Sequence, residues 1–279
     1  MIQAIEAFSH INDVKTDILL TESKEYTEWL IERVLHFNNT IIYCVGGDGT
    51  LNYIVNAISK NNIENLIIQA IPAGTGNDFC RTLYGNKIPN IKKLLESKNI
   101  KEIDLIDINN EKLAVNSVSI GLDVRVLEKV EQYRSKNKGQ SNYYNKAIID
   151  TILENPSYNA NIFVDGIQLE KQEDKTLVAI CNGGFYGNGK QISPNSKIDD
   201  GLLDIISSQS MNRPELILLL SKLKLNASHL ESDKVLNYST QEVEIHNNKE
   251  DIVYQADGEL DKTKRLTLSC KPRGLTIKY

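Results

Sequence analysis

The sequence Val-Gly-Gly-Asp-Gly-Thr at positions 45–50, followed by Pro-Ala-Gly-Thr-Gly-Asn-Asp at positions 72–78, decides the fold of this chain. Each stretch comes directly after an apolar, strand-like run and directly before a segment that begins as a helix. Glycine in such a turn lets the backbone approach a ligand closely, and the next helix offers unpaired N–H groups to an anion. Because both turns carry an aspartate and a threonine, they predict a site for nucleotide phosphates and their metal ion.

Strand-like and helical segments alternate through the first part of the chain. Apolar runs at 40–45 and 66–71 predict strands buried on both faces of a parallel sheet, and a short strand is expected at 17–20. Helical spacing of apolar residues is found at 2–11, 23–37, 51–58 and 89–97. This order predicts an open parallel sheet with helices on both sides, in which a ligand binds beyond the carboxyl ends of the strands. Both glycine turns occupy that edge.

Short strands dominate the rest of the chain, and we interpret them as a second, mostly antiparallel β-sandwich domain. Strands are expected at 101–108, 112–118, 159–164, 176–181, 202–207, 242–246, 252–256, 265–269 and 274–279. Helices are expected at 122–133, 143–153 and 214–223. The predicted fold class is therefore α/β, with a nucleotide-binding domain at 1–107 and a β-sandwich domain at 108–279. Asn109-Asn110, close to this boundary, is a good turn pair.

The composition limits the classes of function. Of the 279 residues, 41% are hydrophobic and 25% are charged, as in ordinary globular proteins. The net charge of −5 argues against a nucleic-acid partner, because no basic excess is present to neutralise phosphates. No run of about 18 apolar residues predicts a transmembrane helix. The four cysteines form no Cys-x-x-Cys pair, which favours reduced thiols in a cytoplasmic protein over disulfides or a zinc site.

Four motifs together resemble the catalytic-domain family of diacylglycerol kinases, which includes sphingosine, ceramide and bacterial lipid kinases. The motifs lie at 47–52, 72–79, 197–202 and 257–259, and the resemblance extends from Thr21 to the C-terminus. The first motif is shared with NAD kinases, whereas Asn77-Asp78-Phe79 in the second is similar to lipid kinases more narrowly. The resemblance implies an enzyme of phospholipid metabolism that transfers the γ-phosphoryl group of ATP to the hydroxyl of diacylglycerol or a related lipid.

The resemblance places ATP on the two glycine turns. The residues that it implies in nucleotide binding are Thr21, Gly47, Asp48, Gly49, Thr50, Leu51, Asn52, Tyr53, Gly74, Thr75, Asn77 and Asp78. Backbone N–H groups of the first turn would surround the phosphates, and Asp48 would help to hold Mg²⁺ between the β- and γ-phosphates. On its own, the Gly-Gly-Asp-Gly sequence is also compatible with an ordinary turn.

The other two motifs are common turns when read alone. Asp257-Gly258 is typical of a hairpin turn. By resemblance, Glu259 is the proton acceptor that activates the substrate hydroxyl. Asp48 is the second residue that the resemblance implies in catalysis. Asp-Asp-Gly at 199–201 is typical of a surface turn. By resemblance this loop holds a second Mg²⁺ away from the chemistry, through the Asp200 carboxylate and two backbone carbonyl groups. Those carbonyl groups belong to Lys197 and Leu202. Asp104 matches an acidic residue at the family's domain junction.

The chain departs from the family at two positions. The family opens with a strand that ends in Asn-Pro-x-Ser-Gly, whereas Met1-Ile2-Gln3 already belongs to a helix, and we expect a start codon that was assigned too late. Tyr53 stands where the family usually has an acidic residue. We therefore expect the affinity for the nucleotide, or the choice of nucleotide, to differ from that of the family. An NAD kinase-like enzyme and a catalytically impaired lipid- or nucleotide-binding regulator remain as alternatives. We expect peripheral contact with a membrane that presents the lipid, and the choice between monomer and homodimer stays open.

Overall fold

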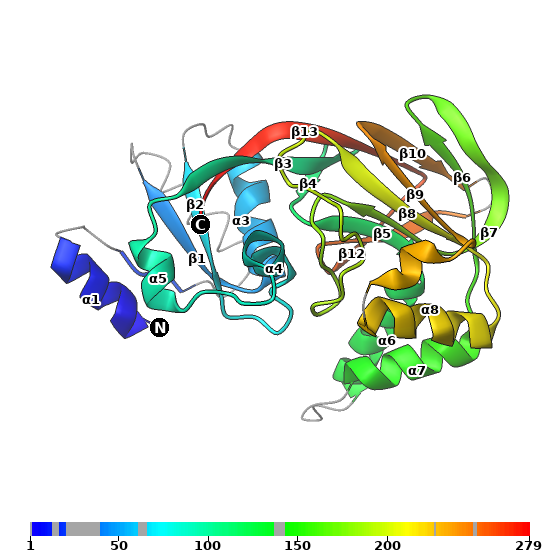
Figure 1. Cartoon of the computed structure of the whole chain (residues 1–279), viewed down its shortest axis with the longest axis horizontal. Helices are drawn as coiled ribbons and strands as arrows, with labels where there is room; N and C mark the ends of the chain where they lie inside the picture. The colour runs from blue at the N-terminus through cyan, green and yellow to red at the C-terminus, as the bar shows by residue number, and fades with distance from the viewer. Residues whose placement is uncertain are drawn as a thin grey trace.

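The N-terminal part of the chain is built on a small sheet that the C-terminal strand completes. The computed structural model describes residues 2–12, 17–20, 40–60, 66–136, 143–225, 227–247 and 250–279. Strands β1 (Ile41–Gly46) and β2 (Ile67–Pro72) pair in parallel. The end of β13 (Arg265–Lys278) pairs in parallel with β2 and antiparallel with β3 (Ile100–Ile108). Strands β3 and β13 therefore run between the two halves of the molecule (Figure 1).

Helices cover both faces of this sheet, as predicted. Helices α3 (Asp48–Lys60) and α4 (Asp78–Tyr84) pack on the face that carries Ile68 and Ala70. Helices α1 (Ile2–Asn12) and α5 (Ile91–Glu96) pack on the opposite face against Ile71. Neighbouring residues of β2 thus point to opposite cores, which is the pattern of a strand buried on both sides. Both glycine turns follow the carboxyl ends of their strands.

The C-terminal part is a β-sandwich whose two layers are joined through strands β6 and β7. One layer contains β4 (Lys112–Ala114), β3, β13, β10 (Glu242–His246) and β6 (Tyr158–Val164). The other contains β9 (Val235–Thr240), β8 (Leu203–Gln209), β7 (Ile167–Cys181), β5 (Ser117–Gly121), β11 (Ile252–Ala256) and β12 (Glu259–Thr263). Fully buried side chains such as Ile106, Ile180 and Ile245 fill the space between the layers. The predicted fold class is confirmed.

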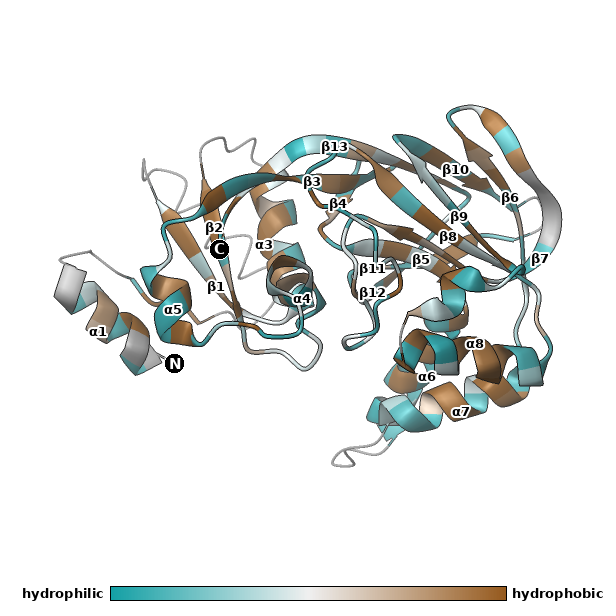
Figure 2. Cartoon of the chain, in the orientation of Figure 1, coloured by the Kyte–Doolittle hydropathy of each residue, from teal (hydrophilic) through white to brown (hydrophobic). Residues whose placement is uncertain are grey.

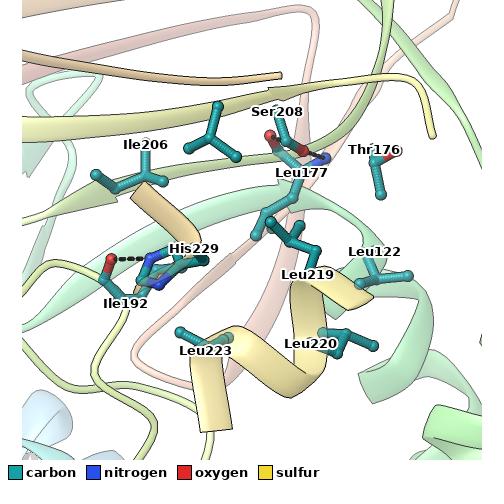
Figure 3. Close-up of a pocket in the computed structure, with 11 residues that line it drawn as sticks. Leu122, Thr176, Leu177, Ile192, Ile206, Ser208, Leu219, Leu220, Leu223 and His229 are labelled. Atoms are coloured by element: carbon teal, nitrogen blue, oxygen red, sulfur yellow. Dashed lines mark hydrogen bonds between the residues drawn. The ribbon is translucent and has the colours of Figure 1, made fainter. Parts of the chain in front are cut away.

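Helices α6 (Leu122–Lys136) and α8 (Arg213–Leu225) lie against the outer face of the second layer, and α7 (Tyr143–Glu154) packs on these two helices. Helix α8 packs Leu216, Leu219 and Leu223 on β7 and β8, and α6 lies beside α7. A short 3₁₀ helix, η1 (Ser228–Glu231), follows α8. Between α8 and the strands is an apolar pocket with a cavity volume of ≈ 20 Å³, enough for about one water molecule (Figure 3). In the part of the chain that the structure describes, none of the helices has the length and apolar character needed to cross a membrane.

Several predicted elements differ from the structure. Residues 17–20 form no strand, and the helix predicted at 23–37 lies outside the described residues. The strand predicted at 112–118 is split into β4 and β5, because the backbone N–H groups at the break bind a carboxylate instead of a neighbouring strand. The strands predicted at 265–269 and 274–279 are one strand, β13, interrupted only by an irregularity between Lys271 and Leu275.

Two strands, β9 and β12, were not predicted from the sequence. Strand β9 pairs only with β8, and β12 pairs only with β11, so both lie at edges of the described sheet. Their sequences, Val-Leu-Asn-Tyr-Ser-Thr and Glu-Leu-Asp-Lys-Thr, are too polar to stand out as apolar runs. Polar and charged side chains are common on edge strands, because they discourage pairing with another chain.

Candidate active site

The two glycine turns touch each other backbone to backbone. A Cβ atom built on Gly74 would lie 2.5 Å from the Gly47 Cα atom, and one built on Gly47 would lie 3.2 Å from the Gly74 Cα atom. Gly46 is equally confined, because its Cβ atom would lie 2.6 Å from Thr50 Oγ1. The glycines at these positions therefore allow a close approach of two loops that any side chain would push apart.

The carboxylate of Asp48 joins the first turn to the second. Asp48 is the first residue of α3, yet its Oδ2 accepts the Asp78 N–H at 3.1 Å and its Oδ1 accepts the Phe79 N–H at 3.0 Å. These N–H groups begin α4 and have no partner within that helix, so a carboxylate stabilises them. The geometry thus gives Asp48 a structural part in the site, and its contact with Mg²⁺ stays a prediction.

Asn77 closes the second turn on itself. It adopts a left-handed backbone conformation with φ 52°, which asparagine tolerates better than most residues. Its Nδ2 donates to the Gly74 carbonyl at 2.8 Å, and its Oδ1 accepts the Gly74 N–H at 2.9 Å. This pair of hydrogen bonds leaves Thr75 exposed at the tip of the turn, where its hydroxyl is accessible to a ligand.

Asp78 connects the nucleotide turns to the β-sandwich. It is buried, and its two oxygens accept the N–H groups of Asn188 at 3.0 Å and Gly189 at 2.6 Å. Burial raises the pKa of this carboxyl, and the two hydrogen bonds oppose the shift. The partner loop was not predicted as part of the site. A Gly-Asn-Gly sequence at 187–189, in which all three residues have positive φ, was the available signal.

Asp257 anchors the turn between β11 and β12. Its φ of 48° and the φ of 91° at Gly258 show a tight hairpin turn with two left-handed residues. The carboxylate accepts N–H groups from Val115 at 2.7 Å, Asn116 at 3.0 Å and Ser117 at 3.0 Å. These three donors come from the break between β4 and β5. The hairpin expected at Asp257-Gly258 is thus present, and its carboxylate is directed into the protein.

Asn52 supplies a fourth donor to the same carboxylate. Its Nδ2 donates to Asp257 Oδ2 at 2.8 Å and to the Leu113 carbonyl at 3.0 Å. Asn56 lies one helical turn later and binds both backbone groups of Leu113. Its Nδ2 donates to the Leu113 carbonyl at 2.8 Å, and its Oδ1 accepts the Leu113 N–H at 2.8 Å. Asn52 is only 7% exposed, so its amide links α3 to the hairpin, and a direct contact with ATP stays a prediction. Leu51 is buried in the core, and Tyr53 is half-buried.

Glu259, the predicted base, lies beside the first glycine turn. It is the first residue of β12, directly after the hairpin that Asp257 anchors. A Cβ atom built on Gly49 would lie 3.7 Å from Glu259 Oε1. Residues more than two hundred positions apart therefore place a half-buried carboxylate next to the expected phosphate loop. This is the arrangement that a proton acceptor for an attacking hydroxyl requires.

Asp104 determines the shape of the loop at 197–202. It is 2% exposed, and it accepts the N–H groups of Gly201 at 2.7 Å and Arg273 at 2.9 Å. Within the loop, Asp200 Oδ1 accepts the Leu202 N–H at 3.1 Å. Asp200 is exposed, and one carboxylate with two carbonyl groups is a hard-oxygen donor set that suits Mg²⁺.

The structure brings the two glycine turns, Asp48, Asp78 and Glu259 together. The loop at 197–202 is tied to Asp104, separately from the contacts that join the glycine turns to Glu259. Over the described ranges, no group of three or more His, Cys, Asp or Glu side chains has the arrangement of a metal centre. Thr21 lies outside the described residues.

Comparisons with known proteins identify two matched regions. Residues 1–108 match the family described as the diacylglycerol kinase catalytic domain, and residues 116–279 match the YegS C-terminal NAD kinase beta sandwich-like domain. A protein of Staphylococcus aureus strain MSSA476, named a "putative lipid kinase", is 30% identical over 177 residues. One of Staphylococcus carnosus strain TM300 with the same name is 30% identical over 179 residues. Each match covers 62% of this chain, and 56% and 55% of the relatives, so little more than half of their length is spanned.

Solved structures share the fold. A crystal structure titled as a "putative diacylglycerol kinase" from Bacillus anthracis str. Sterne superposes with a TM-score of 0.79 at 24% sequence identity. The superposition covers 100% of this chain and 90% of that chain. A second structure from the same organism, titled as a diacylglycerol kinase, gives a TM-score of 0.76. At this level of identity the likeness establishes the architecture.

Proposed function

This chain belongs to the diacylglycerol kinase-like family and carries its catalytic and YegS C-terminal domains, and from that premise we propose that it is an ATP-dependent lipid kinase. The acceptor is the hydroxyl of diacylglycerol or a related lipid, and the product is a phosphate monoester that enters phospholipid metabolism. One observation carries the proposal: the Glu259 carboxylate lies next to Gly49, where the phosphate loop begins α3. A base and a phosphate loop in contact are the two parts that phosphoryl transfer to a hydroxyl requires.

Each part of the site has a separate role in the proposed reaction. Backbone N–H groups at 47–50 bind the phosphates, and the exposed Thr75 hydroxyl contacts the nucleotide. Glu259 removes the proton of the lipid hydroxyl as its oxygen attacks the γ-phosphorus, and the bond to the β–γ bridging oxygen breaks to release ADP. The Asp48 carboxylate would help to hold Mg²⁺, which would supply positive charge to neutralise the transferring group. The donor set of Lys197, Asp200 and Leu202 would hold a second Mg²⁺ that stabilises its loop.

Contact with a lipid surface is part of the proposal. Helices α7 and α8 are neighbours (Figure 1), and both carry hydrophobic residues (Figure 2). Five large apolar side chains on these helices are exposed, namely Ile149, Leu153, Ile217, Leu218 and Leu225, with exposed fractions of 55–80%. Arg213 and Lys224 of α8 are also exposed, and basic side chains favour an anionic membrane. The small pocket beneath α8 (Figure 3) is too small for an acyl chain.

The proposal is tested by offering two acceptors in separate reactions that contain γ-labelled ATP and Mg²⁺. The full chain is given phosphatidylglycerol vesicles that contain diacylglycerol in one reaction and NAD in another. We expect label in the lipid extract and none in the dinucleotide. Label in NAD would overturn the proposal in favour of an NAD kinase-like enzyme. Binding of ATP without transfer to diacylglycerol, ceramide or sphingosine would instead favour a catalytically impaired regulator.

A further inference from the structure

A second set of buried polar groups supports the turn that carries Glu259, on the side away from Asp257. Gln255, on β11, is 4% exposed, and its side chain is bonded at both ends. Its Oε1 accepts the Gly258 N–H at 2.7 Å, and its Nε2 donates to Ser119 Oγ at 2.6 Å. One amide thus connects the second residue of the hairpin turn to the neighbouring strand β5, with which β11 is paired.

The direction of these hydrogen bonds is determined by the groups at the two ends. A backbone N–H can only donate, so the Gln255 carbonyl oxygen must face Gly258 and its NH₂ group must face Ser119. The Ser119 hydroxyl donates in turn to Asp123 Oδ2, which also lies 3.4 Å from Gln255 Nε2. Asp123 stands in the first turn of α6 and accepts the Val124 N–H at 3.0 Å. The chain of donors therefore ends on a carboxylate, and reversing the amide would leave Gly258 unpaired.

Two independent anchors consequently hold the hairpin turn. Asp257 is fixed to the β4–β5 break and to α3, and Gly258 is fixed through Gln255 to β5 and α6. Gly258 has a φ of 91° and no atom within 4 Å of the position of its absent Cβ, so packing alone does not restrain it. Glycine is the residue with the greatest backbone freedom. The Gln255 hydrogen bond thus restricts the Asp257–Gly258 peptide, in addition to the backbone pairing of Ala256 with Glu259 in the hairpin.

We propose that Gln255 is a positioning residue for phosphoryl transfer, which fixes the Gly258 peptide and through it the direction of the Glu259 carboxylate. The inference rests on the proposed function, because it gives Glu259 the role of the base. Loss of the anchor changes the geometry of proton removal while the glycine turns that hold ATP keep their contacts. A displacement of the base by about 1 Å lowers the rate on the order of 10²-fold.

The test compares Gln255→Leu with Thr240→Val. Leucine approximates the size of glutamine and leaves the β11 backbone pairing intact. Thr240 is 2% exposed, and its hydroxyl lies 2.8 Å from Asp165 Oδ1 and accepts the Glu242 N–H at 3.1 Å. Its variant therefore loses buried side-chain hydrogen bonds outside the site, as Gln255→Leu does within it. With diacylglycerol vesicles we expect Gln255→Leu to lower kcat about 10- to 100-fold, with KM for ATP changed less than about threefold. Thr240→Val keeps the wild-type kcat.

Hydrogen exchange separates failure of this inference from failure of the proposed function. We expect amide exchange of the segment 256–260 to be faster in Gln255→Leu than in wild type and unchanged in Thr240→Val, whether or not a lipid is phosphorylated. An active wild type together with an undiminished kcat in Gln255→Leu overturns the inference. So does an equal change in kcat and in KM for ATP. If Gln255→Leu does not fold, Ser119→Ala, which removes the acceptor of the Gln255 amide, must lower kcat in the same direction.

Discussion

At the scale of single residues, buried and half-buried carboxylates organise the site by binding backbone N–H groups. Asp48 binds the start of α4, Asp78 binds the 188–189 loop, Asp104 binds Gly201 and Arg273, and Asp257 binds the β4–β5 break. A carboxylate can accept several hydrogen bonds at once, which allows one side chain to fix a loop that no regular element would hold. These residues hold loops of the active site in place, in addition to any contact with ATP or Mg²⁺.

Asp123 makes stability depend on pH. Burial raises its pKa from 3.8 to about 6, so the folded state holds a proton that the unfolded state has released. The free energy of unfolding contributed by this group therefore falls as the pH rises from about 4 to about 6, by on the order of 1–2 kcal/mol. Lys190 and the Tyr144, Tyr186 and Cys181 side chains interact with Asp123, and none of them changes charge in that range.

Urea unfolding of wild type and Asp123→Asn at several pH values measures this contribution. We expect the stability of the variant relative to wild type to increase between pH 4 and pH 6, because asparagine does not titrate. A difference between the two proteins that stays constant over this range would show that Asp123 ionises in the folded state as it does in water.

At the scale of elements, the contact between the two glycine turns sets the shape of the nucleotide site. The absence of a side chain at Gly74 is required by the neighbouring Gly47 Cα atom and not by a positive φ. We predict that Gly74→Ala separates the turns, raises KM for ATP about tenfold and lowers the free energy of unfolding by about 1–3 kcal/mol.

Gly85→Ala is the matched control, because a methyl group there meets no atom within 4 Å and only the backbone conformation, φ 70° with ψ −160°, is penalised. Its KM for ATP should equal that of wild type, with a stability loss of about 1–3 kcal/mol. Steady-state kinetics over a range of ATP concentrations gives KM, and urea unfolding gives the stability. Equal ATP affinity in the two variants would contradict the account.

Local sequence signals were sufficient for elements that form by themselves and insufficient for those that depend on distant partners. The apolar runs predicted β1 and β2, and the glycine turns were placed at the correct edge of the sheet. The break after Ala114 was not predictable, because its cause is Asp257, more than a hundred residues later. Strands β9 and β12 were missed since edge strands need few apolar residues. The same limit applies to Gln255, whose role appears only when β11 is paired with β5.

At the scale of the whole molecule, β13 makes the two halves depend on each other. Its first residues lie in the β-sandwich core, while Leu275 and Ile277 lie in the core beneath α3 and α4. Ile277 is fully buried, and its backbone pairs with both β2 and β3. The nucleotide half therefore requires the last residues of the described chain for its own core.

Ile277→Ala tests this dependence. We expect a loss of about 2–5 kcal/mol in the free energy of unfolding, since a buried isoleucine is replaced by a smaller side chain and a cavity. Leu225→Ala, at a side chain that is 80% exposed, should change stability by less than about 0.5 kcal/mol. Urea unfolding followed by circular dichroism measures both. If Ile277→Ala is as stable as Leu225→Ala, the C-terminal strand does not support the nucleotide half.

The central claim is that Glu259, beside the first glycine turn, acts as the base. The most direct test replaces its carboxylate by an amide, which cannot accept the proton. Single-turnover transfer of the γ-phosphoryl group to diacylglycerol in vesicles should be about 10²- to 10⁴-fold slower in Glu259→Gln than in wild type. ATP affinity should be the same in both proteins, because glutamine keeps the size of the side chain. An undiminished transfer rate in Glu259→Gln would contradict the account.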